Sequence, residues 1–150
     1  MAHIRIPKDA ESFLPLVSTH RSNDAARSNH HCFDSYAELA VFLASYGFAI
    51  RRHQLPESKN EAFLQQPGPI DIGIFSKSDQ RFPPLLFIAL AATNDQKVVR
   101  DEDRICEIAE LFAAAGSRAL RAHIEKEGTT QHLAIAKILA KFSPQEELKI

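Results

Sequence analysis

The chain has 150 residues and a mass of 16.8 kDa, enough to bury a core, and we expect residues 1–150 to form a single compact domain. With 45% hydrophobic and 25% charged residues, the composition excludes disordered, collagen-like and coiled-coil chains. The 18 basic and 19 acidic side chains give a formal net charge of -1, which argues against a strongly basic nucleic-acid module but is compatible with a local basic face.

The cysteine content and the apolar runs indicate a cytoplasmic protein. The only cysteines, Cys32 and Cys106, are too few for the disulfide framework of a small secreted domain, so reduced thiols are expected. Residues 1–8 contain no continuous apolar segment, and the longest apolar run, residues 85–92, is too short to span a bilayer. We therefore expect no membrane partner.

The N-terminal third is predicted to be an arm, a short helix and a loop. Residues 3–6 alternate polar and apolar side chains and stop at Pro7, so residues 1–7 are predicted to be a short strand or an extended arm. Residues 8–17 allow a helix, which Pro15 makes short or kinked. Residues 20–31 are rich in Ser, Asn, Asp and Arg and are expected to be an exposed loop.

The strongest local signal is a helix that begins at Ser35. In a capping box, the Ser35 hydroxyl accepts from the Glu38 amide and the Glu38 carboxylate accepts from the Ser35 amide. Gly47 is predicted to end the helix in a left-handed conformation. The apolar positions of one helix face are Leu39, Phe42, Leu43 and Tyr46.

The middle of the chain is predicted to contain a loop, a strand and a buried helix. Residues 51–69 lack a sustained period and form a connecting loop with at most a short helix around residues 61–65. Residues 70–75 alternate as a strand that could pair with the N-terminal arm. Pro83-Pro84 favours a helix start, and residues 85–92 are apolar all round, as in a buried helix.

Three further helices are predicted in the C-terminal third. The first begins near Asp101 and ends at Gly116, and the second, shorter one ends at Gly128. The third begins at Thr129 or Thr130 and ends at Pro144, so that residues 143–150 are a frayed tail. The predicted fold is thus mainly α, with about five to six helices and a short two-stranded ribbon.

The sequence offers little support for a metal site or for a catalytic nucleophile. His30, His31 and Cys32 are candidate metal ligands, but adjacent residues rarely bind one tetrahedral ion, and a polar loop is the preferred interpretation. A magnesium-dependent nuclease could use Asp71, although no strand with Glu-x-Lys follows it and a solvated strand face explains this residue. Serine-elbow, Walker A and dinucleotide patterns do not occur. We expect no cofactor and no enzymatic activity.

Basic residues form clusters that could contact DNA phosphates. Arg51 and Arg52 follow the predicted helix end, and Lys97, Arg100 and Arg104 gather near the next helix start. If the fold brings these side chains together, a phosphate-binding stripe results. The alternative interpretation is a mixed solvated surface with acidic residues interspersed. A further basic pair, Arg118 and Arg121, lies on one face of a predicted helix.

Four segments in order support a family resemblance: residues 33–48 followed by Arg51-Arg52, then 72–75, 88–95 and 111–116. Together they resemble the DNA phosphorothioation-associated protein 4 family, also called Dnd system-associated protein 4, from about Ile4 to about Phe142. The polar segment 20–31 and the long loop 51–69 depart from the family pattern, so residues around the first helix are not transferred one by one.

The resemblance implies a role beside the machinery that replaces a non-bridging phosphate oxygen of DNA with sulfur, or beside the restriction partners that use this mark. It gives no established active site that could be carried over to this chain. Our leading hypothesis is a non-enzymatic accessory protein of this bacterial defence system that binds double-stranded DNA, a protein component of the system, or both. The alternatives are a pure assembly subunit, with self-association left open, and a small metal-dependent nuclease.

Overall fold

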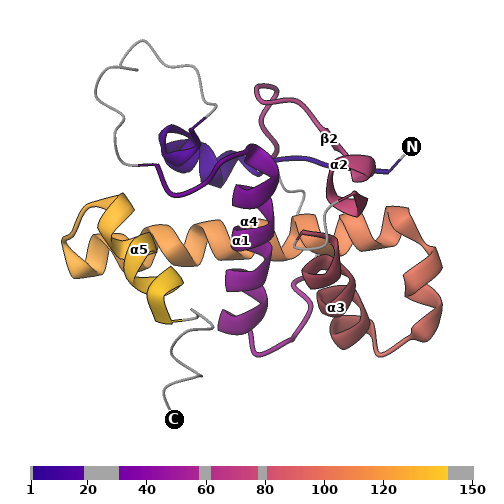
Figure 1. Cartoon of the computed structure of the whole chain (residues 1–150). Helices are drawn as coiled ribbons and strands as arrows, with labels where there is room; N and C mark the ends of the chain where they lie inside the picture. The colour runs from indigo at the N-terminus through magenta and orange to yellow at the C-terminus, as the bar shows by residue number, and fades with distance from the viewer. Residues whose placement is uncertain (1, 19–30, 58–61, 78–80, 142–150) are drawn as a thin grey trace.

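The computed structural model describes residues 2–18, 31–57, 62–77 and 81–141 of the chain (Figure 1). The predicted tail over residues 143–150, the predicted helix end at Pro144 and all but the last residue of the predicted loop 20–31 lie outside this description. The elements in chain order are β1 (His3–Ile4), the 3₁₀ helix η1 (Lys8–Leu16), α1 (Tyr36–Ile50), β2 (Ile70–Asp71), α2 (Ile72–Ser76), α3 (Phe82–Thr93), the 3₁₀ helix η3 (Gln96–Arg100), α4 (Glu102–Glu127) and α5 (Gln131–Lys141). The predicted mainly α fold with a two-stranded ribbon is confirmed.

The ribbon joins the N-terminal arm to the middle of the chain. Strands β1 and β2 are antiparallel, with His3 opposite Asp71 and Ile4 opposite Ile70. The prediction that the second strand continues to Phe75 is wrong, because the Asp71 side chain accepts a hydrogen bond from the Gly73 amide at 3.3 Å and caps α2. Such a cap offers the backbone an alternative to strand pairing after two residues.

The segment between the arm and α1 is closed by a second pairing. Helix η1 contains Pro15, and the predicted short or kinked helix is realised as a 3₁₀ helix. Beyond it, Val17 pairs in parallel with Phe33. The Cys32 amide donates to the Leu16 carbonyl at 2.8 Å, and the Ser18 amide donates to the Phe33 carbonyl at 2.8 Å. The described residues that flank positions 19–30 are therefore hydrogen-bonded to one another.

Helix α1 begins where the capping box predicts. The Ser35 hydroxyl accepts from the Glu38 amide at 3.3 Å. The Glu38 carboxylate accepts from the amide of Asp34 at 2.8 Å, one residue earlier than predicted. The helix does not end at Gly47 but continues to Ile50.

Gly47 and Gly116 lie where α1 crosses α4, in the most extensive contact between two elements (Figure 1). An added Cβ would lie 2.0 Å from the Phe112 carbonyl oxygen at Gly47, and 2.2 Å from the Leu43 carbonyl oxygen at Gly116. Both predicted helix stops are therefore wrong, and the two helices predicted on either side of Gly116 are the single helix α4. Because glycine has no side chain, the backbones of α1 and α4 come into contact at these positions. A local sequence pattern does not reveal such a contact between distant segments.

The start of α3 and the end of α4 agree with the predictions made from the sequence. Prolines occupy the first turn of α3, as predicted. The helix is not buried all round, however: Leu85 and Ile88 face the core, whereas Phe87 is exposed. Gly128 ends α4 with a φ of 64°, as predicted.

One ion pair fastens the arm to α4. The Glu110 side chain is 8% exposed, and its carboxylate accepts from the Arg5 Nε at 2.8 Å and the Arg5 Nη2 at 2.9 Å. The backbone amide of Arg5 donates to the same carboxylate at 2.8 Å. The Arg5 guanidinium also lies over the Phe63 ring, 3.8 Å from its centroid. In the described part of the chain, no helix has both the length and the apolar character needed to cross a membrane.

Candidate functional site

Arg51 and Arg52 lie at the C-terminal end of α1, where both side chains are exposed. The Arg51 amide donates to the Gly47 carbonyl at 3.0 Å and continues the helical pattern for one residue. The next two residues, Arg52 and His53, have φ values of 52° and 71°, a left-handed conformation that L side chains rarely adopt. Within the described residues, no ion pair involves either arginine. The Arg51 Nε donates to the Gln54 carbonyl at 3.0 Å, and neither guanidinium is paired with a carboxylate of the described residues.

Lys97, Arg100 and Arg104 lie together on a different part of the molecule. Lys97 and Arg100 belong to η3, and Arg104 belongs to the first turn of α4. Helix α3 contacts both α1 and η3 and lies between this cluster and the end of α1 (Figure 1). The structure therefore does not merge all five predicted DNA-binding residues into one continuous site.

Acidic side chains accompany this second cluster. The Asp95 and Asp101 carboxylates cap η3 and α4 by accepting from the amides of Lys97 and Arg104. The Arg104 guanidinium pairs with Glu107 at 2.8 Å. A phosphate approaching η3 would meet both signs of charge, which weakens the electrostatic attraction relative to that of an arginine pair alone.

Arg118 and Arg121 serve an internal contact. Their guanidinium groups lie 3.2 Å and 3.6 Å from the two carboxylate oxygens of Asp9 in η1. This places the predicted basic helix face against an acidic partner and ties η1 to α4.

The described residues contain no group of three or more His, Cys, Asp or Glu side chains that could hold a metal ion. His30 lies outside the described residues, and His31 is exposed. The Cys32 Sγ lies 3.9 Å from the His132 carbonyl oxygen. Asp71, the candidate nuclease residue, is the exposed cap of α2.

Burial disfavours the thiolate form of both cysteines. Burial raises the pKa of Cys106 to about 12, and the nearby carboxylate of Glu110 adds to this effect. Burial also raises the pKa of Cys32. Since the thiolate is the nucleophile and the metal-binding form, both cysteines remain in the unreactive thiol form at neutral pH.

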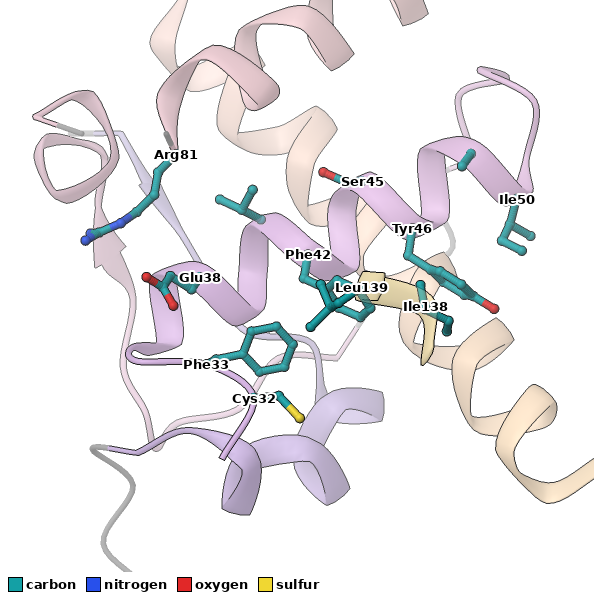
Figure 2. Close-up of a pocket in the computed structure, with 12 residues that line it drawn as sticks. Cys32, Phe33, Glu38, Phe42, Ser45, Tyr46, Ile50, Arg81, Ile138 and Leu139 are labelled. Carbon is teal, nitrogen blue, oxygen red and sulfur yellow. The ribbon is translucent and has the colours of Figure 1, made fainter. Parts of the chain in front are cut away.

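A groove of about 670 Å³ runs along α1 and is closed on one side by α5 (Figure 2). Glu38 and Arg81 lie at one end and Ile50 at the other. Its main apolar side chains are Phe33, Phe42, Tyr46, Ile50, Ile138 and Leu139. Sequence reasoning missed this groove and assigned Phe42 and Tyr46 to the core face. One signal was available: after Glu38, α1 contains no charged residue, so it must be covered on more than one face.

Comparison with solved structures finds no match, and comparison with curated proteins finds none either. A family match does cover nearly the whole chain. Residues 3–149 match the family described as DNA sulphur modification system-associated protein 4, in agreement with the resemblance found in the sequence. The chain belongs to this family.

Proposed function

We propose that this chain is a non-enzymatic, cytoplasmic accessory protein of a DNA sulphur modification system that acts by binding DNA. The observation behind this proposal is the exposed pair Arg51 and Arg52 at the end of α1, which has no ion pair among the described residues. Association with such a system follows from the family. We further propose that it serves bacterial antiviral defence through the restriction that accompanies the sulfur mark.

Charge placement favours the end of α1 as the phosphate-binding site. Guanidinium groups bind phosphate oxygens with two parallel hydrogen bonds, and each neutralised phosphate releases a condensed counterion. Among the described residues Arg51 and Arg52 form no ion pair, whereas the Asp95 and Asp101 carboxylates cap η3 and α4 beside the second cluster. Lys97, Arg100 and Arg104 are proposed as secondary contacts for a duplex long enough to reach past α3.

The proposal is tested by binding the protein to matched duplexes with and without phosphorothioate linkages across a salt series. Arg51→Ala/Arg52→Ala should weaken binding and reduce the slope of log K against log salt by roughly 1.8, since each phosphate contact contributes about 0.9. Lys126→Ala/Lys137→Ala removes the same charge from exposed positions on α4 and α5 and is the matched control. A lack of binding to either duplex at low salt would refute DNA binding, and an equal loss in both variants would refute the assigned residues.

The groove along α1 supports a second candidate function, the docking of a protein component of the system. Its open shape and apolar walls suit the apolar face of an amphipathic helix, and Glu38 and Arg81 at one end offer charged contacts to the polar face. Leu139 lines the groove and is 39% exposed. Leu133, on the same helix, is also exposed but does not line it.

This difference provides a matched pair of variants. Leu139→Asp should abolish co-elution with the co-expressed proteins of the system, whereas Leu133→Asp should preserve it. Light scattering on the purified chain tests self-association: a dimer that only Leu139→Asp dissociates would make a second copy the occupant of the groove. If both variants co-elute like the wild type, the groove is not the docking surface.

A further inference from the structure

We propose that the end of α1 is a stacking site for an unpaired DNA base, with His53 and Phe87 as the platform and Arg51 and Arg52 as contacts to the flanking phosphates. This inference rests on the proposed DNA binding and narrows its ligand to single-stranded or locally opened DNA.

The platform is a group of aromatic rings built around Phe48. The His53 ring stacks on Phe48 with centroids 4.2 Å apart and planes inclined by 7°. The Phe87 ring meets Phe48 edge-on, with centroids 6.0 Å apart. Phe48 itself is buried, whereas Phe87 is 62% exposed, the largest value among the described large hydrophobic side chains. Two aromatic rings at the surface thus rest on one buried ring.

The backbone fixes His53 in this position. Its left-handed conformation, which favours glycine, is held by a hydrogen bond from the His53 amide to the Phe48 carbonyl at 3.0 Å. The Gln54 amide donates to the Arg51 carbonyl at 3.1 Å, and the Arg51 Nε donates to the Gln54 carbonyl at 3.0 Å. The imidazole is therefore ordered before a ligand arrives, which reduces the entropy cost of stacking on it.

The surrounding charge selects an anionic ligand. Helix α3, which carries Phe87, contains no charged residue, and α1 contains none after Glu38 in its first turn. Arg51 and Arg52 directly precede His53 and place two positive charges at this end of α1. Flat apolar rings next to cations match a polyanion that carries aromatic bases. Inside an intact duplex the base faces are covered by their neighbours, so an unstacked base gains more from the platform than a paired base.

Phe87 allows a direct test because the chain contains no tryptophan. In Phe87→Trp, the indole is the only one in the protein, and a stacked base should quench its emission. The probes are a 12-nucleotide oligothymidine and a blunt 12-base-pair duplex, with affinities measured by anisotropy of a fluorescein label. Phe87→Leu keeps an apolar side chain but removes the ring. Ile74→Ala, at another exposed apolar position, is the control.

We expect Phe87→Leu to weaken oligothymidine binding about tenfold, within the range for loss of one stacked base, and to leave duplex binding unchanged. Phe87→Trp should retain affinity and show quenching by oligothymidine, and Ile74→Ala should bind like the wild type. If the wild type binds DNA but Phe87→Leu binds oligothymidine equally well, the stacking site is refuted while DNA binding stands. If the wild type binds neither probe at low salt, DNA binding itself fails.

Discussion

Replacing Gly47 or Gly116 with alanine should force α1 and α4 apart. The new Cβ would lie 2.0 Å or 2.2 Å from a backbone carbonyl oxygen of the facing helix, whereas ordinary contact begins near 3.4 Å. A backbone atom cannot rotate away as a side-chain tip can, so the helices must separate by about 1 Å or more. This separation weakens every other contact across the crossing.

The expected cost is a loss of about 2 kcal/mol or more in the free energy of unfolding for each variant. Overpacking costs roughly 1–3 kcal/mol and occasionally more, and a clash with a fixed backbone atom belongs at or above the upper end of this range. A gap of 0.5–1 Å also forfeits about a quarter to a half of the dispersion energy of each separated atom pair. Alanine returns only about 1 kcal/mol through its better helix propensity. Against a total stability of roughly 5–15 kcal/mol, the net loss is readily measured.

Urea unfolding followed by circular dichroism is the assay. Gly73→Ala is the matched control, because its added Cβ would lie 3.6 Å from its nearest neighbour, an ordinary contact. The double variant Gly47→Ala/Gly116→Ala should lose less than the sum of the two single losses, since one helix displacement accommodates both methyl groups. Unchanged or increased stability in either single variant, with the denaturant slope preserved, would refute the close crossing.

Three further predictions concern stability. Arg5→Ala should lower the free energy of unfolding in urea by about 2 kcal/mol, because the buried Glu110 carboxylate keeps only one backbone donor. Arg5→Lys should recover only part of this stability, because one ammonium group does not span both carboxylate oxygens. An unchanged urea midpoint in Arg5→Ala would contradict this prediction. Burial raises the pKa of the Cys106 thiol to about 12 from an ordinary 9.0, so the unfolded chain loses the thiol proton at a lower pH than the folded chain does. The free energy of unfolding should therefore be unaffected below pH 9 and fall by about 1.4 kcal/mol per pH unit between pH 9 and 12. Cys106→Ala should flatten this alkaline loss, and equal slopes in the two proteins between pH 8 and 10 would count against it. Ser35→Ala should cost about 1 kcal/mol and Ser35→Asp much less, and equal thermal midpoints would show that the cap is not needed.

Local signals predicted the fold well where a single turn of chain decides the structure. The Ser35 cap, the prolines that open α3 and the left-handed Gly128 depend on neighbours within four residues, and all three are confirmed. Gly47 and Gly116 were misread because their role is set by a helix 69 positions away in the chain.

The candidate sites show the same difference between features that are visible locally in the sequence and features that depend on distant segments. Arg51 and Arg52 were found by charge alone, since a basic pair after a helix is visible in the sequence. The groove was not found, because it forms only when α5 packs beside α1. The exposure of Phe87 was hidden by its position in an apolar run, which predicts burial on all sides. Which face of an apolar helix stays uncovered depends on packing partners that a pattern does not specify.

The pairing of Val17 with Phe33 makes the chain between Ser18 and His31 a suitable place to insert an additional segment. Both ends of the intervening chain are held by backbone hydrogen bonds to the core at Leu16 and Phe33, so extra length inserted between Ser18 and His31 does not pull on α1. Doubling the length of chain between two fixed ends costs only about 0.6 kcal/mol in closure entropy. An affinity tag or a fluorescent domain can therefore be carried internally, leaving the N-terminal arm and α5 unmodified for partner-capture experiments.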